Sequence, residues 1–158
     1  MSQITEARLK DARNLWGEAL VAISLAFDEE GLDAARQRAN EALDVAYGYH
    51  LGPVLFKPTM AGGEQTFRTT RAGALSYFIG HNEEFPQDGG FGLKSWRQVA
   101  SSAGTAFIES DIALWMGHVT FTNSQGEQTV VDKSWGYKQD QEGQLRIVLH
   151  HSSLPFEV

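Results

Sequence analysis

The first third of the chain repeats apolar positions with the period of two helices. Between residues 4 and 27, apolar side chains recur at steps of three and four and share one helical face: Leu9, Ala12, Trp16, Ala19, Ile23 and Phe27. Gly31 follows an acidic break in this pattern and suits the left-handed conformation past a helix end. A second run, from Leu32 to Tyr49, is rich in alanine and permits close helix packing. We expect an antiparallel helical hairpin that ends at Gly52-Pro53.

The middle of the chain predicts shorter elements. Residues 54–59 have the composition of a strand, and Pro58 restricts it to a sheet edge or a strand end. Thr69 or Thr70 can cap a short helix that follows. The glycine-rich stretch 81–92 predicts a loop long enough to act as a lid or a functional loop.

The last third of the chain has the period of extended strands. Alternation of side chains predicts three long strands joined by two tight turns, after two shorter strands; their ranges are 96–102, 105–109, 112–122, 129–137 and 145–153. Because the helices come first and the sheet last, we expect an α+β fold in which the helices pack on one face of a strongly curved antiparallel sheet. The length of the chain predicts a single domain over residues 1–158.

Strict alternation divides each long strand into two faces, and the odd-numbered set is the more apolar and aromatic. We assign that set to the concave face under the helices. Lys133 and His151 are the two exceptions, one a charged and the other a titratable side chain, and isolated burial of such groups costs several kcal/mol. The interpretation is a pocket between the helices and the sheet, with these expected ligand-binding residues: Tyr49, Tyr77, Trp115, Val119, Lys133, Trp135, Leu149 and His151.

The even-numbered face carries Met116 and the polar residues His118, Asp132 and His150, with apolar residues between them. Two histidines and one carboxylate can in principle hold a metal. A partner surface with a hydrogen-bonded histidine accounts better for the mixture, so we expect a homodimer interface here and no metal site.

Composition narrows the function classes. The formal net charge of −7, without a basic stripe, disfavours a nucleic-acid partner, and no apolar run is long enough to span a membrane. The absence of Cys excludes disulfides, thiolate nucleophiles and thiolate metal sites. The residues after Met1 lack the features of a signal peptide, so we expect a cytoplasmic protein unless a leader precedes the sequence.

The element order resembles that of the nuclear transport factor 2-like superfamily, with its cystatin-like α+β cone. The ending Asp132-Lys133-Ser134-Trp135, an acidic turn and Ile147-Val148-Leu149-His150-His151-Ser152-Ser153-Leu154-Pro155 is similar to the association domain of calcium/calmodulin-dependent protein kinase II, and the layout also resembles bacterial SnoaL-like proteins. The resemblance implies that Lys133 and His151 stand where the kinase domain has basic pocket residues. Gly117 stands where that domain has a third.

Three functional hypotheses follow. The first is a domain of unknown function that binds a small apolar or anionic molecule and needs no cofactor. The second is an enzyme of the SnoaL or ketosteroid-isomerase type, with His151 as the best candidate for a base and a helix tyrosine as oxyanion donor. The third is an oligomerisation or association module. The sequence leaves open whether the protein is an enzyme.

Overall fold

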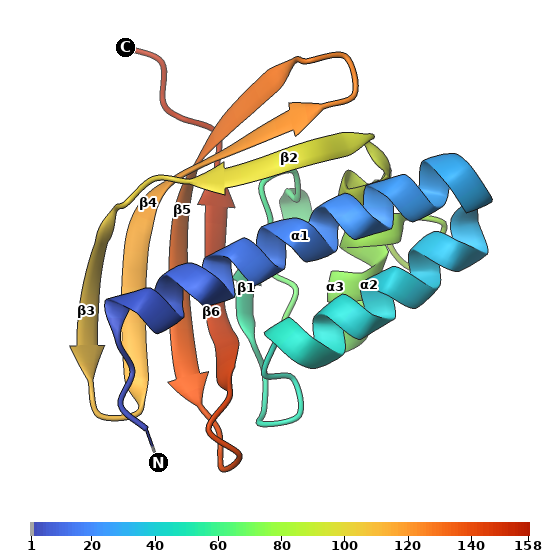
Figure 1. Ribbon diagram of the computed structural model, residues 1–158. Helices are drawn as coiled ribbons and strands as arrows, with labels where there is room; N and C mark the ends of the chain where they lie inside the picture. Colours follow the sequence, from blue (N-terminus) through green and yellow to red (C-terminus); the bar gives the residue numbers. More distant parts are fainter. Residues whose placement is uncertain (1) are drawn as a thin grey trace.

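A computed structural model describes residues 2–158 of the protein (Figure 1). The helices are α1 (Glu6–Glu30), α2 (Leu32–Ala46) and α3 (Arg71–Ile79), with short 3-10 turns η1 (Gly63–Gln65) and η2 (Phe91–Leu93). The strands are β1 (Leu55–Lys57), β2 (Trp96–Ser101), β3 (Thr105–Glu109), β4 (Ile112–Asn123), β5 (Gln128–Gln139) and β6 (Leu145–Ser153). The predicted helical hairpin, short helix and strands are all present.

Local sequence signals set the ends of the helices. The Thr5 hydroxyl accepts a hydrogen bond from the backbone N–H of Arg8 and caps α1. Gly31, at φ 97°, ends that helix and permits the sharp turn into α2. Thr70 caps α3 in the same way as Thr5 caps α1, through the N–H of Gly73.

The sheet has the order β1-β6-β5-β4-β2, and β3 pairs with the other half of β4. Figure 1 shows α1 lying across the concave face of the curved sheet, with α2 and α3 beyond it. The α+β architecture is confirmed. The prediction of a wholly antiparallel sheet needs one correction, because β1 pairs parallel to β6 at the edge, where the chain arrives after the helical hairpin.

The core lies between the concave face and the helices and is largely aromatic. Trp16 and Leu20 of α1 pack in one cluster with residues of α2, α3, β4, β5 and β6. Trp16 meets Phe121 and Trp135 edge to face, at ring centroid distances of 6.0 and 5.2 Å. Most of the large aromatic side chains are thereby buried, as their number requires.

A β-bulge in β6 determines which side chains face the core. Gly136 pairs with Leu149, but the next residue of β5, Tyr137, pairs with Ile147, so Val148 is left as an extra residue. The alternation of inward and outward side chains therefore shifts by one residue at Val148. Ile147 is buried before the bulge, and His150 and Ser152 are buried after it.

The bulge overturns part of the predicted concave face. Leu149 is half-buried on the other side and His151 is exposed, so the prediction that they face the core is wrong. The assignment of His150 to the outer face is also wrong, because this side chain is only 1% exposed inside the core. Strict alternation from residue 145 to residue 153 was the faulty assumption.

Among residues 2–158, no helix combines the length and the apolar character needed to cross a lipid bilayer.

Candidate active site

Lys133 is the central polar group of the core. It lies on β5, is 3% exposed, and has no carboxylate within ion-pair distance among residues 2–158. Its Nζ lies 2.8 Å from Nε2 of His150. It also lies 4.8, 5.6 and 5.2 Å from the ring centroids of Trp16, Phe121 and Trp135, at cation–π distances. Burial lowers the pKa of Lys133 to about 7, so the neutral amine and the ammonium are both populated near neutrality.

His150 connects this lysine to a buried tyrosine. Its ring stacks on Phe56 at 4.5 Å, and its Nδ1 lies 2.8 Å from the hydroxyl of Tyr47. The indole N–H of Trp16 donates to the same hydroxyl at 3.0 Å. Burial, followed by the charge of Lys133, holds the pKa of His150 well below its usual range, so the imidazole is neutral at physiological pH.

The contacts define the proton positions when Lys133 is charged. An ammonium can only donate, so Nε2 of a neutral His150 must accept, and the ring proton must then lie on Nδ1. Nδ1–H donates in turn to the oxygen of Tyr47, which also accepts from Trp16. The result is an ordered chain of buried groups in which the lysine is the one member that titrates near neutral pH.

Three hydroxyl groups, those of Ser152, Thr59 and Tyr77, lie in the region around these buried side chains. Ser152 is the ladder partner of Lys133 on the neighbouring strand, and its Oγ is 2.5 Å from Oγ1 of Thr59. The oxygen of Tyr77 accepts from the backbone N–H of Met60 at 3.2 Å. Burial raises the pKa of Tyr77, although bonds from Met60 and the Thr59 hydroxyl oppose the rise. A backbone N–H can only donate, so the Tyr77 oxygen is the acceptor of the Met60 bond and its own O–H remains available as a donor.

Local structure explains how the hydroxyls meet. The strand β1 is short, and Pro58 follows it, so the chain leaves the sheet edge just before Thr59. Lys57 anchors this segment by donating from Nζ to the carbonyl of Ser152 at 2.9 Å. On the other side, the frame change at Val148 turns Ser152 inward beside Lys133.

The predicted pocket residues divide into three groups. Trp115, Val119, Lys133, Trp135 and Tyr77 are buried on the concave side, where alternation and the helix pattern place them. Tyr49 lies half-buried at the margin, stacked on Tyr47 at 6.0 Å and donating to the carbonyl of Arg68. Leu149 and His151 lie outside. The residues that the sequence reasoning did not place in the pocket are Trp16, Thr59, His150 and Ser152; Gly136, a glycine inside a strand, was the available signal for the bulge.

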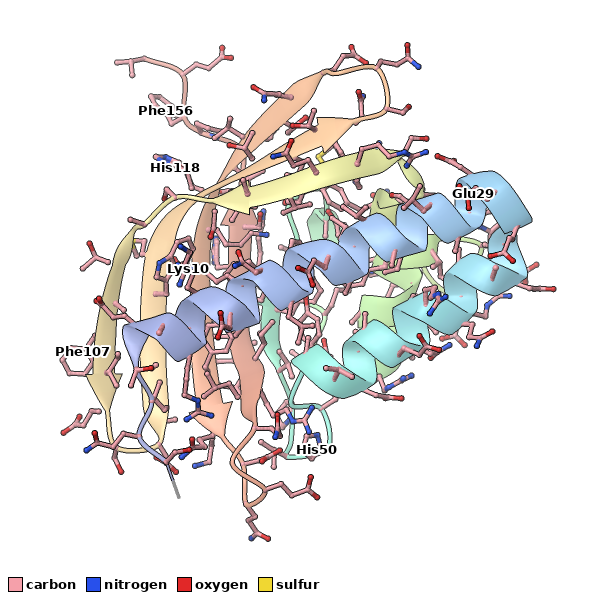
Figure 2. The ribbon with its side chains drawn as sticks, in the orientation of Figure 1. Lys10, Glu29, His50, Phe107, His118 and Phe156 are labelled. Carbon is pink, nitrogen blue, oxygen red and sulfur yellow. The ribbon has the colours of Figure 1, made fainter. Side chains whose placement is uncertain are left out.

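The predicted interface residues, apart from His150, do lie on the outer face. Met116 is 67% exposed, and Nε2 of His118 lies 3.1 Å from Oδ1 of Asp132. Figure 2 shows His118 on the outer side of the sheet, away from α1. The homodimer expected on this face stays a prediction. No three His, Cys, Asp or Glu side chains within residues 2–158 are grouped so that they could hold a metal ion.

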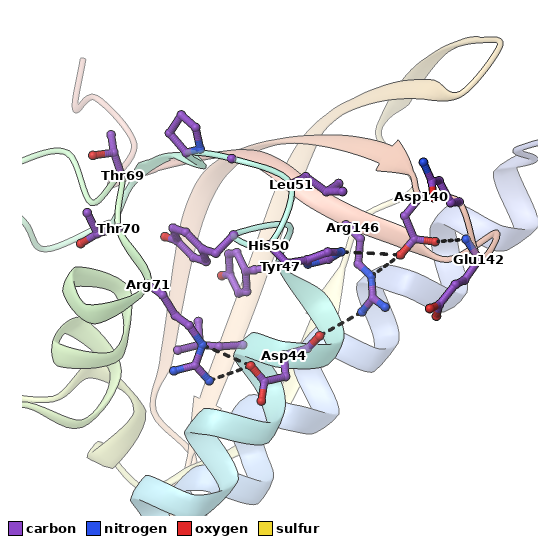
Figure 3. A pocket seen from close by; sticks show the side chains of 15 residues that line it. Asp44, Tyr47, His50, Leu51, Thr69, Thr70, Arg71, Asp140, Glu142 and Arg146 are labelled. Carbon is purple, nitrogen blue, oxygen red and sulfur yellow. Dashed lines mark hydrogen bonds and ion pairs between the residues drawn. The ribbon is translucent and has the colours of Figure 1, made fainter.

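A hollow of the surface, about 850 Å³, lies between the end of α2 and the β5–β6 turn (Figure 3). Apart from the exposed Glu142, its acidic and arginine side chains neutralise one another: Arg71 pairs with Asp44 at 2.7 Å and Arg146 with Asp140 at 2.9 Å. Tyr47 forms part of its inner wall. The unpaired polar groups lie deeper, beyond Tyr47, and this contrast identifies the Lys133–His150 region rather than the hollow as the candidate active site.

The chain has the fold of nuclear transport factor 2-like proteins. A calcium/calmodulin-dependent protein kinase II association domain-like structure from Xanthomonas campestris has a TM-score of 0.60 at 22% identity, covering 96% of this chain and 86% of that one. At this identity the similarity concerns the fold alone.

A comparison with protein families is more specific than the fold. The family model described as metal-independent carbonic anhydrase matches residues 7–154, and the chain belongs to this family. The metal-independent carbonic anhydrase of Nostoc sp. (strain PCC 7120 / SAG 25.82 / UTEX 2576) is 52% identical over 154 residues, which cover 98% of this chain and 75% of that protein. The crystal structure of a cyanobacterial iota-carbonic anhydrase complexed with bicarbonate has a TM-score of 0.95 at 51% identity, covering 99% of this chain and 95% of that one.

These similarities correct the functional hypothesis drawn from the sequence. A ligand-binding domain of unknown function is wrong, because the whole described fold matches a family of named enzymes. The two alternatives, an isomerase-like enzyme that uses His151 and an association module, fall with it. The exposed position of His151 is a separate argument against its use as a base inside the core.

Proposed function

We propose that this protein catalyses the reversible hydration of carbon dioxide to bicarbonate with its own side chains. Family membership and the similarity to a structure complexed with bicarbonate support the reaction. The single observation that carries the mechanism is the buried Lys133, which has no carboxylate partner among the described residues, lies 2.8 Å from His150 and is the ladder partner of Ser152.

The reaction requires a base and a set of donors. A water oxygen forms a bond to the carbon of CO₂, one C=O electron pair moves onto an oxygen, and the water loses a proton. A base with a pKa near the working pH serves this proton transfer best. The pKa of Lys133, about 7, fits that requirement, whereas the pKa of His150 lies too low for effective proton capture.

His150 is then a positioning residue. With its proton on Nδ1, its Nε2 accepts an N–H of Lys133 in both charge states of the lysine. The lone pair of the neutral amine is left to accept the proton of the attacking water. Tyr47 and Trp16 support this arrangement by fixing the other side of the imidazole.

The hydroxyls of Thr59, Tyr77 and Ser152 are the proposed binding groups for the oxygen atoms of CO₂ and bicarbonate. Ser152 and Thr59 share one hydrogen bond, and the free phenol O–H of Tyr77 can donate to the oxygen on which negative charge develops. Such preoriented donors lower the barrier most effectively in a dry site. The surrounding rings of Phe56 and Trp16 provide an apolar environment for CO₂.

Stopped-flow CO₂ hydration with a pH indicator tests the proposal on protein dialysed against a chelator and checked for residual metal by elemental analysis. We expect activity above the uncatalysed rate, and a decrease of about 10²–10³-fold for Tyr77→Phe, the range typical for loss of one oxyanion donor. Thr59→Val and Ser152→Ala should act in the same direction. His151→Ala is the matched control and should retain wild-type rates. A chelated wild type that does not exceed the blank would overturn the proposal.

A further inference from the structure

Another buried cation, Arg13, lies on α1. It projects from α1 toward the sheet and is 8% exposed. Its Nε donates to Oγ of Ser101 at 3.0 Å, and its guanidinium carbon lies 4.5 Å above the centre of the Trp115 ring. Within residues 2–158 it forms no ion pair, so most of its five N–H donors have no partner.

Arg13 lines a cavity of about 430 Å³ between α1 and strands β2, β3 and β4. The charged residues that line the cavity with it are Lys10 and Glu6, which leaves one net positive charge. Figure 2 shows Lys10 on the N-terminal half of α1. The remaining polar lining comes from Asn14, Ser101 and Ser102.

The floor of this cavity is held in a fixed position. A Cβ atom on Gly104 would lie 2.6 Å from Nε1 of Trp115, and one on Gly117 would lie 2.6 Å from the same ring. Gly104 also has φ 59°, a conformation that side chains disfavour. The indole N–H donates to the carbonyl of Ala103 at 2.9 Å. The two glycines therefore let the indole lie flat against the backbone, with Arg13 over its face.

The energetics favour an anion in this place. Burial of a guanidinium without an acid partner costs several kcal/mol, and cation–π contact with Trp115 offsets only part of that cost. Desolvation lowers the pKa of Arg13, while Tyr137 and Glu6 oppose the change. The hydroxyl of Tyr137 is itself buried without a hydrogen-bond partner. The Tyr137 hydroxyl is thus enclosed without a partner, whereas the terminal N–H groups of Arg13 face the cavity, where a ligand can reach them.

We propose that this cavity binds a small carboxylate-type monoanion, either bicarbonate or a short carboxylate, on the free N–H groups of Arg13. A planar two-oxygen anion matches the geometry of the guanidinium, and Ser101 and Ser102 supply further hydrogen bonds at the rim. The single net positive charge, with Glu6 at the margin, disfavours phosphates of higher charge. This site is separate from the Thr59, Tyr77 and Ser152 hydroxyls.

Nitrogen-15 NMR of the Trp115 indole N–H detects anion binding in the Arg13 cavity without any assay of activity. The cross-peak is assigned with Trp115→Phe and followed during addition of sodium bicarbonate or sodium acetate, with sodium chloride keeping the ionic strength constant. We expect a saturable shift with both anions and none with acetamide, which has the shape of acetate but no charge. Tighter binding of bicarbonate than acetate would identify the reaction's own product as the ligand, and the reverse would identify a carboxylate.

Matched variants test whether Arg13 is the residue that binds the anion. Arg13→Gln should weaken binding at least about tenfold, and Arg13→Lys should fall between it and wild type because it keeps the charge but loses the planar fork. Ser152→Ala should leave the Trp115 shift unchanged, which separates this site from the proposed active site. A linear shift without saturation, the same shift with chloride, or equal affinity in a folded Arg13→Gln variant would each overturn the proposal.

Discussion

Arg68 and Lys133 are equally buried, each 3% exposed, but the molecule treats the two cations differently. Arg68 forms two bonds of 2.7 Å with the carboxylate of Asp88, which also accepts from Ser76 at 2.6 Å. Further bonds from Arg68 reach the carbonyls of Gln65 and Gly73. Lys133 has a neutral imidazole and aromatic faces instead.

The difference separates a structural ion pair from a reactive group. A fully paired guanidinium keeps its charge and fixes the segments that it joins, here α3 and the loop after it. An unpaired lysine in an apolar site approaches the pKa at which it can accept and release a proton. The surroundings of the cation, rather than its burial, therefore indicate its role.

The largest expected effect is the loss of catalysis in Lys133→Met. Removal of a general base typically costs about 10²–10⁴-fold in rate. Because the charge is uncompensated, we expect the free energy of unfolding to stay equal or to rise. Stopped-flow assays and urea denaturation on the same preparation measure both quantities. An active variant, or one that loses stability along with activity, would place Lys133 in the same class as Arg68.

The corresponding change at the other cation is Asp88→Asn. It leaves Arg68 buried without its charged partner, and breaking such a pair costs about 3–5 kcal/mol. We expect this loss in the free energy of unfolding from urea denaturation. Asp11→Asn, an exposed acid on α1, is the control and should change it by less than about 0.5 kcal/mol. A small effect of Asp88→Asn would mean that the pair is dispensable for stability.

The free energy of unfolding should depend on pH through the titration of Lys133. Its pKa is about 7 in the folded protein and higher in the unfolded chain, so the unfolded chain binds more protons between about pH 7 and 10. Stability contributed by this group therefore rises with pH in that window, by up to about 1.4 kcal/mol per unit. Urea denaturation at pH 7 and 9 should show the rise in wild type but not in Lys133→Met; parallel curves for the two proteins would contradict the assignment.

A solvated cation should give the smallest effect. Arg38 pairs with Glu41 on the surface of α2 at 3.3 Å, and both side chains are about half exposed. Exposed pairs of this kind contribute about 0.2–0.5 kcal/mol, so Arg38→Ala should shift the melting temperature only slightly. A loss comparable to that of Asp88→Asn would show that pairing matters regardless of burial.

The sequence predicts those parts of the fold in which a simple period holds. The helical hairpin follows from steps of three and four, and the inward positions of Trp115, Lys133 and Trp135 follow from regular alternation. The inward position of His150 could not be predicted, because one extra residue in β6 changes the frame and alternation alone does not reveal it.

Apart from that of Tyr77, the hydroxyl groups around Lys133 and His150 could not be located from the sequence, for another reason. Thr59 lies after the end of β1, and Tyr47 lies at the end of α2, so tertiary packing rather than local period sets their positions. Serine, threonine and tyrosine are also common in surface positions, and no motif spacing distinguishes those that line the proposed active site. The family similarity was needed to connect them with carbon dioxide.

The extra residue Val148 also indicates where this chain can change in length. Deleting it would leave an unbroken ladder in which Ile147 pairs with Tyr137, Leu149 with Gly136 and His150 with Trp135, so His150 and Ser152 would still face the core. A residue inserted after Leu149 would instead shift His150 and Ser152 away from Trp135 and Lys133. Related sequences that keep this active site should therefore preserve the number of residues between Leu149 and Ser152, even where position 148 is lost.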